Sequence, residues 1–310
     1  MEQRPGILTR MQSEGALLTA IRKWRDTLRM MRICCNGSRT RSRLVYELLG
    51  DTNLMCRNSL YLNLGYWEKA RNLDQACQDL AEKVGIVAGL APDDRVLDAG
   101  CGFGDQDIYW VERFSPRKIT AINITPLHIK IAQSRVGQTP WSSRIHFVVA
   151  DAARLTFPSD TFDKVLALES AFHFSTREAF LREAFRVLRP GGMLVAADFV
   201  RKSSRPRWNV SSWAALQLGT RAWQIPMQNL CGAPLYMDIL RQCGYEEVKM
   251  NCISDQVFEP FAEFQRPRFN EPLFRERFHP LVLAAAKLQI DLGFLQELDY
   301  ILVSARKPGD

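Results

Sequence analysis

The spacing of hydrophobic and polar positions predicts alternating helices and strands over most of the chain. Helical periodicity over residues 73–89 is followed by short runs of β-branched and apolar residues, and further helical segments separate these runs. The predicted strands lie at residues 95–98, 118–122, 145–149, 164–168, 193–199, 247–251 and 300–304. This alternation is typical of an α/β fold in which right-handed crossovers join parallel strands.

One helix has clear predicted ends, at residues 176–188. Ser175 and Glu178 have the spacing of a capping box, and Arg189-Pro190-Gly191-Gly192 follows the helix as a stop signal. A shorter helix is expected at residues 237–243, between the fifth and sixth strands. With these helices, the pattern accounts for a sheet of seven strands.

Two long segments interrupt the alternation and are rich in aromatic residues. Residues 201–235 are too long for a simple connection, and residues 254–298 separate the last two strands. We call these segments the lid insertions and expect them to carry helices that cover a pocket. Their candidate pocket aromatics are Trp208, Trp213, Trp223, Phe258, Phe261 and Phe264.

Charge divides the chain, whereas overall composition is ordinary. The 310 residues are 46% apolar and 24% charged, as in globular proteins generally. Residues 1–43 hold 10 Lys and Arg against 3 Asp and Glu, and residues 44–310 hold 31 of each sign. Nucleic-acid enzymes concentrate basic residues on a working face, so the neutral body argues against a nucleic-acid partner. We therefore expect a basic arm, residues 1–43, and a single domain, residues 44–310.

The basic arm contains a predicted amphipathic helix over residues 16–31. Its apolar positions are Leu17, Ile21, Trp24, Leu28 and Met31, and its basic positions are Arg22, Arg25, Arg29 and Arg32. The favoured interpretation is a helix that packs on the domain and leaves its basic face in solvent. Peripheral binding to a membrane surface, or organelle import, is the alternative interpretation.

Location and metal content are also expectations from the sequence. The chain has no run of about 18 apolar residues and no secretory signal at its start, which predicts a cytoplasmic protein. Its eight cysteines form neither a C-x-x-C pair nor a Cys/His grouping at zinc spacing. No metal site is therefore expected.

The most informative segment is Val96 to Gly104, where a hydrophobic strand runs into a glycine-rich turn. A Cβ atom at Gly100 or Gly102 would collide with a nucleotide that closely approaches this backbone. A dinucleotide fingerprint would need its third glycine at position 105, which is Asp105 in this chain. The glycines therefore predict a nucleotide site of another type.

Three carboxylates near this turn narrow the ligand. Asp98 ends the strand, and Asp105 and Asp107 lie at the start of the following helix. Such charges would repel a pyrophosphate at the helix N-terminus. They favour a ligand that carries a cationic amine and a sulfonium.

At this point the sequence resembles the class I methyltransferases that use S-adenosylmethionine. Asp98 to Gly104 matches their motif of an acidic residue, a small residue and Gly-x-Gly-x-Gly. Leu188 to Gly192 resembles their motif before the fifth strand, and the likeness covers roughly residues 60–200 and the closing strands. It implies a Rossmann-like, seven-stranded sheet, mostly parallel with the last strand antiparallel, with N-terminal helices and an inserted, largely helical lid.

The resemblance also implies which residues hold S-adenosylmethionine. Asp98 and the backbone of the glycine turn would hold the methionyl part, and the turn residues are Gly100, Cys101, Gly102 and Gly104. Asp151 would accept a hydrogen bond from the adenine amino group, with Ala152 beside the ring.

One position departs from the family pattern. The second strand ordinarily ends in Asp or Glu, which grips both ribose hydroxyls, whereas this chain has Asn123 followed by Ile124. Asn can accept one hydrogen bond and donate another. With this residue, the sequence resembles a branch of small-molecule methyltransferases. The branch includes tocopherol-type and sterol-type C-methylating enzymes and natural-product O- and N-methylating enzymes.

Two further segments resemble that branch. Asn63 to Trp67 resembles its N-terminal closing segment, in which Tyr66 and Trp67 would cover the substrate; core packing at a helix end is the other interpretation. Leu168 to Phe174 resembles the end of its fourth strand.

The end of the predicted fourth strand supplies the catalytic candidates. His173, with an ordinary pKa near 6.5, is a candidate base, or a histidine that only orients the loop. Glu169 is a candidate for holding the acceptor or the cofactor, or for capping the loop. The remaining histidines, His128, His146 and His279, are expected to be structural.

These observations lead to one main hypothesis for function. Methyl transfer is an in-line displacement, so the protein must align the acceptor with the donor, exclude water and remove a proton. Aromatic side chains in the lid insertions favour a hydrophobic small-molecule acceptor and the nearby sulfonium. We expect O- or N-methylation of a secondary metabolite, with S-adenosylhomocysteine as the second product, by a monomer or homodimer.

Several alternatives remain at this stage. One is a C-methyltransferase acting on a prenyl, sterol or quinone-like acceptor, and another is a cyclase on the same fold. The non-enzyme alternative is a membrane- or RNA-associated binding protein that keeps the nucleotide fold as a scaffold.

Overall fold

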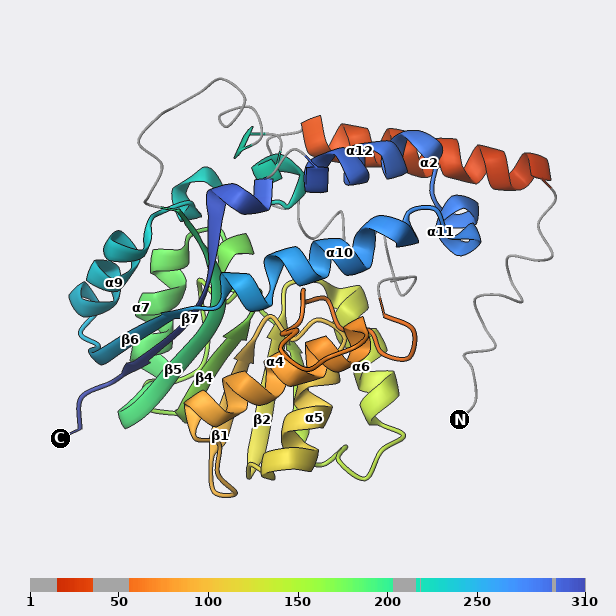
Figure 1. The fold of residues 1–310 in the computed structure, drawn as a ribbon. Coiled ribbons are helices and arrows are strands. Elements are labelled where there is room, and N and C mark those ends of the chain that lie inside the picture. The colour runs from red at the N-terminus through yellow and green to blue at the C-terminus, as the bar shows by residue number, and fades with distance from the viewer. Residues whose placement is uncertain (1–15, 36–55, 203–215, 218, 292–293, 310) are drawn as a thin grey trace.

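The computed structural model describes residues 16–35, 56–202, 216–217, 219–291 and 294–309. Its centre is a seven-stranded sheet with helices on both faces (Figure 1). The strands are β1 (Arg95–Ala99), β2 (Lys118–Asn123), β3 (Ile145–Val149), β4 (Phe162–Leu168), β5 (Leu188–Arg201), β6 (Glu246–Cys252) and β7 (Leu298–Arg306). All seven predicted strands are present.

The strand order is β3-β2-β1-β4-β5-β7-β6. β1 pairs in parallel with β2 and β4, β2 with β3, and β4 with β5. β7 is antiparallel to both of its neighbours, β5 and β6. The expectation of a mostly parallel, Rossmann-like sheet with an antiparallel last strand is therefore confirmed.

Helices α4 (Leu73–Ala88), α5 (Asp105–Phe114) and α6 (Pro126–Val136) pack on one face of the sheet, and α7 (Arg177–Val187) and α9 (Ala233–Gln242) pack on the other. The alternating side chains of β1 serve both faces. Val96 belongs to the apolar cluster of the first group, and Leu97 belongs to that of the second.

Two predicted helix ends are corrected by the structure. The N-cap of α7 is Thr176, not Ser175, because the Thr176 hydroxyl accepts a hydrogen bond from the Ala179 amide at 3.1 Å. α9 starts at Ala233, earlier than the predicted residue 237, with a proline in its first turn. A side-chain cap thus sets the start of α7, whereas α9 begins at a Gly-Ala-Pro sequence without a side-chain cap.

The second lid insertion carries helices, as predicted. They are α10 (Phe258–Arg268), α11 (Pro272–Arg277) and α12 (Pro280–Asp291). Described residues of the first insertion include the short 3₁₀ helix Met227–Asn229. The predicted pocket residues Trp208 and Trp213 lie outside the described residues.

The amphipathic helix of the basic arm is present as α2 (Ala16–Cys35), and it contacts the domain and leaves Arg25 and Arg29 exposed, as the favoured interpretation expected. Thr27 is its buried residue, and its hydroxyl donates to the Lys23 carbonyl at 2.7 Å. Leu18, Ile21 and Leu28 are exposed. α2 therefore turns a polar face toward the domain and an apolar face outward. Among the described helices, none combines the length and apolar character of a membrane span.

Candidate active site

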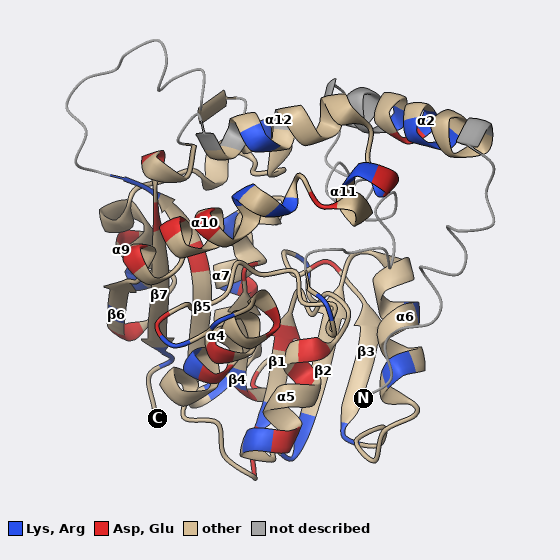
Figure 2. Cartoon of the chain, turned by 45° about the vertical axis from the view of Figure 1, so that its right-hand side comes forward, with Lys and Arg blue, Asp and Glu red and all other residues tan. Residues whose placement is uncertain are grey.

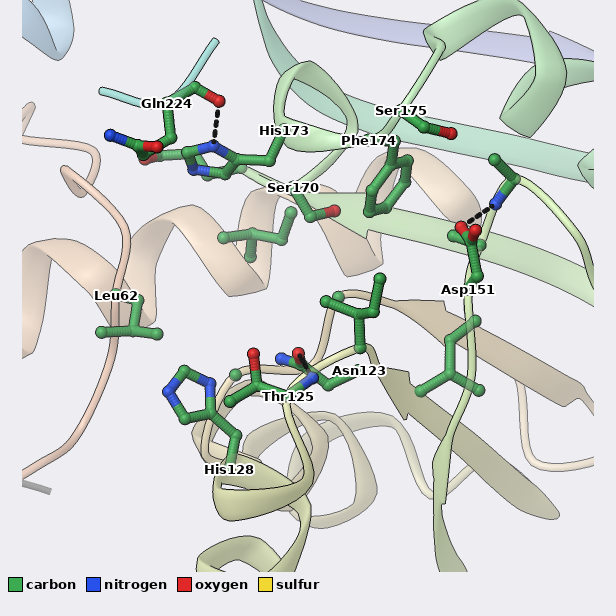
Figure 3. Close-up of a pocket in the computed structure, with 18 of the residues that line it drawn as sticks. Leu62, Asn123, Thr125, His128, Asp151, Ser170, His173, Phe174, Ser175 and Gln224 are labelled. Atoms are coloured by element: carbon green, nitrogen blue, oxygen red, sulfur yellow. Dashed lines mark hydrogen bonds between the residues drawn. The ribbon is translucent and has the colours of Figure 1, made fainter. Parts of the chain in front are cut away.

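A cavity of about 750 Å³ lies beyond the carboxyl ends of β1, β2, β3 and β4 (Figure 3). The first residues after these strands line it, among them Gly100, Ile124, Asp151 and Glu169. In open α/β sheets, ligands bind in the crevice at the carboxyl ends of the strands. The topology therefore brings the sequence-predicted residues to one site.

The glycine-rich turn joins β1 to α5 and forms one wall of the cavity. Gly100 has φ of +100°, and a Cβ atom there would lie 2.3 Å from the Ser170 Cβ. The Ser170 hydroxyl donates to the Ala99 carbonyl and is held in that place. A neighbouring part of the protein itself therefore requires a glycine at position 100, and the collision with a nucleotide that was argued from the sequence stays a prediction. Cys101 is buried behind the turn.

The acidic residues at the start of α5 do not face the cavity, contrary to the sequence argument. Asp105 makes a two-oxygen ion pair with Arg135, at 2.6 and 2.8 Å, and accepts from the Leu60 amide at 3.1 Å. Asp107 is fully buried. Gln106, which the sequence reasoning missed, is the residue between them that lines the cavity.

Asp98 and Asp107 form a buried acidic pair behind Gln106. The Gln106 side-chain amide donates to Asp98 Oδ2 at 3.0 Å, and Asp98 Oδ1 has no hydrogen-bond partner. Burial raises the pKa of Asp98 to about 7. Burial, and then the charge of Asp98, raise the pKa of Asp107 well above the ordinary range. The pair therefore keeps a proton near neutral pH and would ionise further beside a cationic ligand.

Asn123 ends β2 and lines the cavity. Its side-chain oxygen accepts from the Thr125 amide at 3.0 Å, which fixes the side chain and leaves its NH₂ group as the donor for a ligand. Ile124 lines the cavity beside it. The Thr125 amide uses one of the two lone pairs of the Asn123 side-chain oxygen, so the contact expected with a ribose hydroxyl stays a prediction.

His128 was expected to be structural, but it lines the cavity. Its ring packs against Phe103 with centroids 4.2 Å apart, and the side chain is buried. Nothing in the sequence near His128 signals this position, because α6 brings it there. Over the described residues, no group of three or more His, Cys, Asp or Glu side chains is arranged to hold a metal ion.

Asp151 and Ala152 follow β3 and line the same cavity. Asp151 Oδ1 accepts from the Ala153 amide at 2.9 Å, which orients the carboxylate and leaves its other oxygen for a donor (Figure 3). Ala152 is buried. This arrangement provides an oriented acceptor next to a small apolar surface.

His173 lies on a short 3₁₀ helix, Ala171–His173, directly after β4. Its Nδ1 is 3.2 Å from the Gln224 carbonyl, which reaches the site from the first lid insertion (Figure 3). Because a carbonyl only accepts, Nδ1 carries the hydrogen and Nε2 holds a lone pair. Burial lowers the pKa of His173 to about 4, below the ordinary value assumed from the sequence. The imidazole is therefore neutral at physiological pH.

Glu169 lies between β4 and the 3₁₀ helix, with φ of +48°. Its Oε1 accepts from the Leu64 amide at 2.8 Å and from the Tyr300 hydroxyl at 2.7 Å. Burial raises the pKa of Glu169 to about 8. Glu169 therefore ties the end of β4 to β7 and to the chain before α4.

That preceding chain, residues 56–67, forms another wall of the cavity, and we call it the strap. Leu60, Leu62 and Asn63 of the strap line the cavity. The Leu60 amide donates to Asp105, and the Leu64 amide donates to Glu169. The strap residues that contact the cavity thus precede the two aromatics chosen from the sequence.

Tyr66 and Trp67 pack against the apolar core and are absent from the cavity lining. The Trp67 indole nitrogen donates to the Leu64 carbonyl at 2.8 Å, and its ring lies 5.0 Å from that of Phe264. Within the part of the chain that the structure describes, the predicted lid aromatics Phe258 and Phe261 also lie in the core, and Trp223 is partly buried against it. Their contact with a substrate stays a prediction.

Comparison with known proteins identifies the family of this chain. Residues 97–196 match the family described as "Methyltransferase domain". The chain is 34% identical over 278 residues to erythromycin 3''-O-methyltransferase of Saccharopolyspora erythraea, covering 87% of this chain and 91% of the relative. It is 30% identical over 260 residues to 27-O-demethylrifamycin SV methyltransferase of Amycolatopsis mediterranei, covering 80% and 90%.

Solved structures show the same fold. The [4+2]-cyclase SpnF matches with a TM-score of 0.64 at 25% identity, over 81% of this chain and 88% of the other. A putative sarcosine dimethylglycine methyltransferase from Galdieria sulphuraria matches with a TM-score of 0.69 at 15% identity, over 80% and 94%. The sequence relatives, the matched domain and the cavity at the glycine turn agree, and the chain belongs to the S-adenosylmethionine-dependent methyltransferases.

Proposed function

We propose that this enzyme methylates a hydroxyl oxygen of a hydrophobic natural product. The neutral His173, held in one tautomer beside the cavity, is the observation that carries the proposal. The names of the two sequence relatives support the acceptor class, since one methylates an O atom of erythromycin and the other acts on a rifamycin.

S-adenosylmethionine supplies an electrophilic methyl group on a sulfonium. In the proposed reaction, the acceptor oxygen forms a bond to the methyl carbon while the carbon–sulfur bond breaks, and the sulfur keeps the electron pair as S-adenosylhomocysteine. His173 Nε2 takes the hydroxyl proton as the new bond forms. The Gln224 carbonyl then stabilises the imidazolium through Nδ1. The proton passes to water after the product leaves.

The residues present fit the donor in several respects. The orphaned oxygen of Asp98 and the raised pKa of its pair with Asp107 suit a ligand with a cationic amine near the glycine turn. We assign the methionyl part to Asp98, acting through Gln106, and to the backbone of Gly100 to Gly104. The ribose is assigned to Asn123 and Ile124.

The adenine is assigned to Asp151 and Ala152. Asp151 has one oxygen that no strand or turn amide uses, and the adenine amino group is a suitable donor to it. Ala152 offers a flat apolar contact to the ring. This assignment leaves the His173 end of the cavity for the methyl group and the acceptor.

Glu169 is proposed as a positioning residue. It holds the Leu64 amide, and through it the strap residues Leu62 and Asn63, against the cavity. The apolar walls formed by Leu60, Leu62 and Ile225 favour an uncharged acceptor. A hydrophobic small molecule therefore fits the cavity as the methyl acceptor. We also propose that the enzyme acts in the cytoplasm as a monomer or homodimer.

The test uses the purified chain, S-adenosylmethionine and a panel of hydroxylated macrolides, phenols and amines. We expect S-adenosylhomocysteine and an acceptor that gains one methyl group only with hydroxylated, apolar compounds. His173→Ala lowers kcat by about 10² to 10⁴-fold. Donor affinity by calorimetry stays unchanged, because His173 is at the acceptor end. His146→Ala, a histidine on β3 outside the cavity lining, is the matched control. Normal turnover by His173→Ala would remove His173 as the base.

The likeness to SpnF supports a second candidate, a cyclase on this fold. The same incubation separates the two. A cyclase converts its substrate to an isomer of equal mass without forming S-adenosylhomocysteine, whereas a methyltransferase forms both products in equal amounts. A methyl group found on carbon would instead favour the C-methylation alternative.

A further inference from the structure

Helix α2 exposes apolar side chains that a helix packed on a globular domain would bury. Leu18, Ile21 and Leu28 have exposed fractions of 61%, 54% and 59%. Their spacing of three and seven residues places them on one face of the helix. The polar residues Thr27 and Asp26 lie toward the domain instead, Thr27 buried and Asp26 paired with Arg277 at 3.3 Å. The amphipathic helix is thus turned with its apolar face outward.

Contacts with the second lid insertion fix this orientation. The Lys23 ammonium donates to the Arg275 carbonyl in α11 at 2.6 Å. The Trp24 ring lies 4.2 Å from that of His279, just before α12. α12 exposes two leucines of its own, Leu281 and Leu288, each by 53%. These contacts hold α2 by its polar side.

Arginines share the outward face of α2 with the leucines. Arg22, Arg25 and Arg29 follow Leu18 by four, seven and eleven residues, and these spacings place them on the same face of the helix as Leu18. The sequence of α2 contains five Lys and Arg residues and one Asp. Figure 2 shows these basic positions along α2, above the rest of the domain. The surface is both apolar and strongly cationic.

We propose that the outward face of α2 binds the surface of an anionic lipid bilayer. A helix with arginines beside leucine and isoleucine lies in the plane of a membrane interface, with its apolar side chains in the acyl boundary and its cations at the headgroups. An RNA would neutralise the arginines and leave the leucines in water. A second copy would bring like-charged arginines together across the contact. The bilayer is the occupant that satisfies both kinds of side chain, and this binding goes beyond the proposed methyl transfer.

Co-sedimentation of the full chain with vesicles tests the proposal. We expect binding to vesicles of phosphatidylcholine and phosphatidylglycerol, weakened by added salt, and little binding to phosphatidylcholine alone. Ile21→Asp with Leu28→Asp lowers the partition coefficient by at least about tenfold, because it places charge in the acyl boundary. Arg25→Gln with Arg29→Gln lowers it by about tenfold or more.

Matched controls carry the same changes elsewhere. Leu235→Asp alters a leucine of α9 that is 53% exposed, and Arg117→Gln removes an exposed arginine before β2. Both are expected to bind vesicles as the parent chain does, and unchanged thermal unfolding shows that all variants fold. Equal binding to neutral and anionic vesicles, or undiminished binding by the α2 variants, would overturn the proposal. So would a dimer in sedimentation analysis that Ile21→Asp with Leu28→Asp dissociates.

Discussion

Two fully buried aspartates near the carboxyl end of the sheet, Asp198 on β5 and Asp98 on β1, have opposite surroundings. Asp198 is 2.9 Å from Arg177 Nε and accepts from the Tyr236 hydroxyl at 3.2 Å. Asp98 faces another acid, Asp107, and receives a single amide donor. One carboxylate is neutralised within the protein, whereas the other is left to a cation from outside.

This difference in surroundings indicates a structural role for Asp198 and a ligand-binding role for Asp98. The Arg177 guanidinium also donates to the Phe199 carbonyl at 2.8 Å and to the Asn229 carbonyl, so it joins α7, β5 and the first lid insertion. Removal of either partner of a buried ion pair is strongly destabilising, because it leaves the other charge buried without compensation. An acidic pair without a cation gains stability only when a ligand supplies the missing charge.

The largest effect is expected when the ion pair of Asp198 with Arg177 is broken. Arg177→Met leaves Asp198 buried without its cation and lowers the free energy of unfolding by about 3 to 5 kcal/mol. Urea unfolding measures the loss. Arg182→Met, in the exposed pair of Arg182 with Glu178 on the same helix, is the control and is expected to change stability far less, because solvent screens an exposed ion pair. If both variants lose the same stability, the pair of Asp198 with Arg177 does not have the structural role that distinguishes it from the acidic pair of Asp98 with Asp107.

The next effect concerns the pH dependence of donor affinity. Asp98 has a pKa of about 7 without a ligand, so the pair holds its proton below that pH and releases it above. A cationic donor favours the ionised pair. Affinity for S-adenosylmethionine therefore rises about tenfold between about pH 6 and pH 8. At the lower pH, donor binding makes the acidic pair release close to one proton, which the buffer takes up.

Calorimetry in buffers of different ionisation enthalpy measures both quantities. Asp107→Ala removes a side-chain hydrogen bond that lowers the pKa of Asp98, so this pKa rises and the pH dependence of donor affinity moves to higher pH. Glu169→Gln is the control, because Glu169 has a raised pKa of about 8 and also lines the cavity. An affinity that stays flat with pH in the parent chain would show that the acidic pair does not sense the donor.

Glu169 is an intermediate case and gives the smallest expected effect. It has no cation, but two donors share its Oε1. Tyr300→Phe removes one donor, lowers the free energy of unfolding by about 1 kcal/mol and raises the pKa of Glu169 further. Thermal unfolding and the alkaline limb of the pH–rate profile report these changes. Tyr245→Phe removes a buried hydroxyl bonded to the Leu181 carbonyl and serves as the comparison for stability alone. A pH–rate profile that moves equally in both variants would contradict the assignment.

The sequence predicted the sheet well because its signals are local. β1, the glycine turn and the start of α5 follow one another along the chain, and Asn123 and Asp151 follow the next two strands directly. The topology of a parallel sheet then brings such strand ends together. The residues carried by these strand ends reach the cavity as expected, apart from those buried behind the turn.

Side-chain direction was harder to predict, because distant packing decides it. Asp107 turns into the core and Gln106 toward the cavity, although both begin the same helix. His128 and Gln224 reach the cavity from α6 and from a lid insertion, with no motif to mark them. The exposure of Leu18, Ile21 and Leu28 beside the solvent-facing arginines of α2 was not predicted, since amphipathicity alone does not say which residues meet the domain.

Backbone amides anchor the strap, whereas its side chains line the cavity. Asp74 accepts from the Arg57, Asn58 and Ser59 amides, and further carboxylates accept from the Leu60 and Leu64 amides. Every residue except proline carries an amide hydrogen, so the anchors survive most substitutions in the strap. Evolution, or an engineer, can therefore exchange the side chain at position 62 to reshape acceptor preference while the wall itself stays in place.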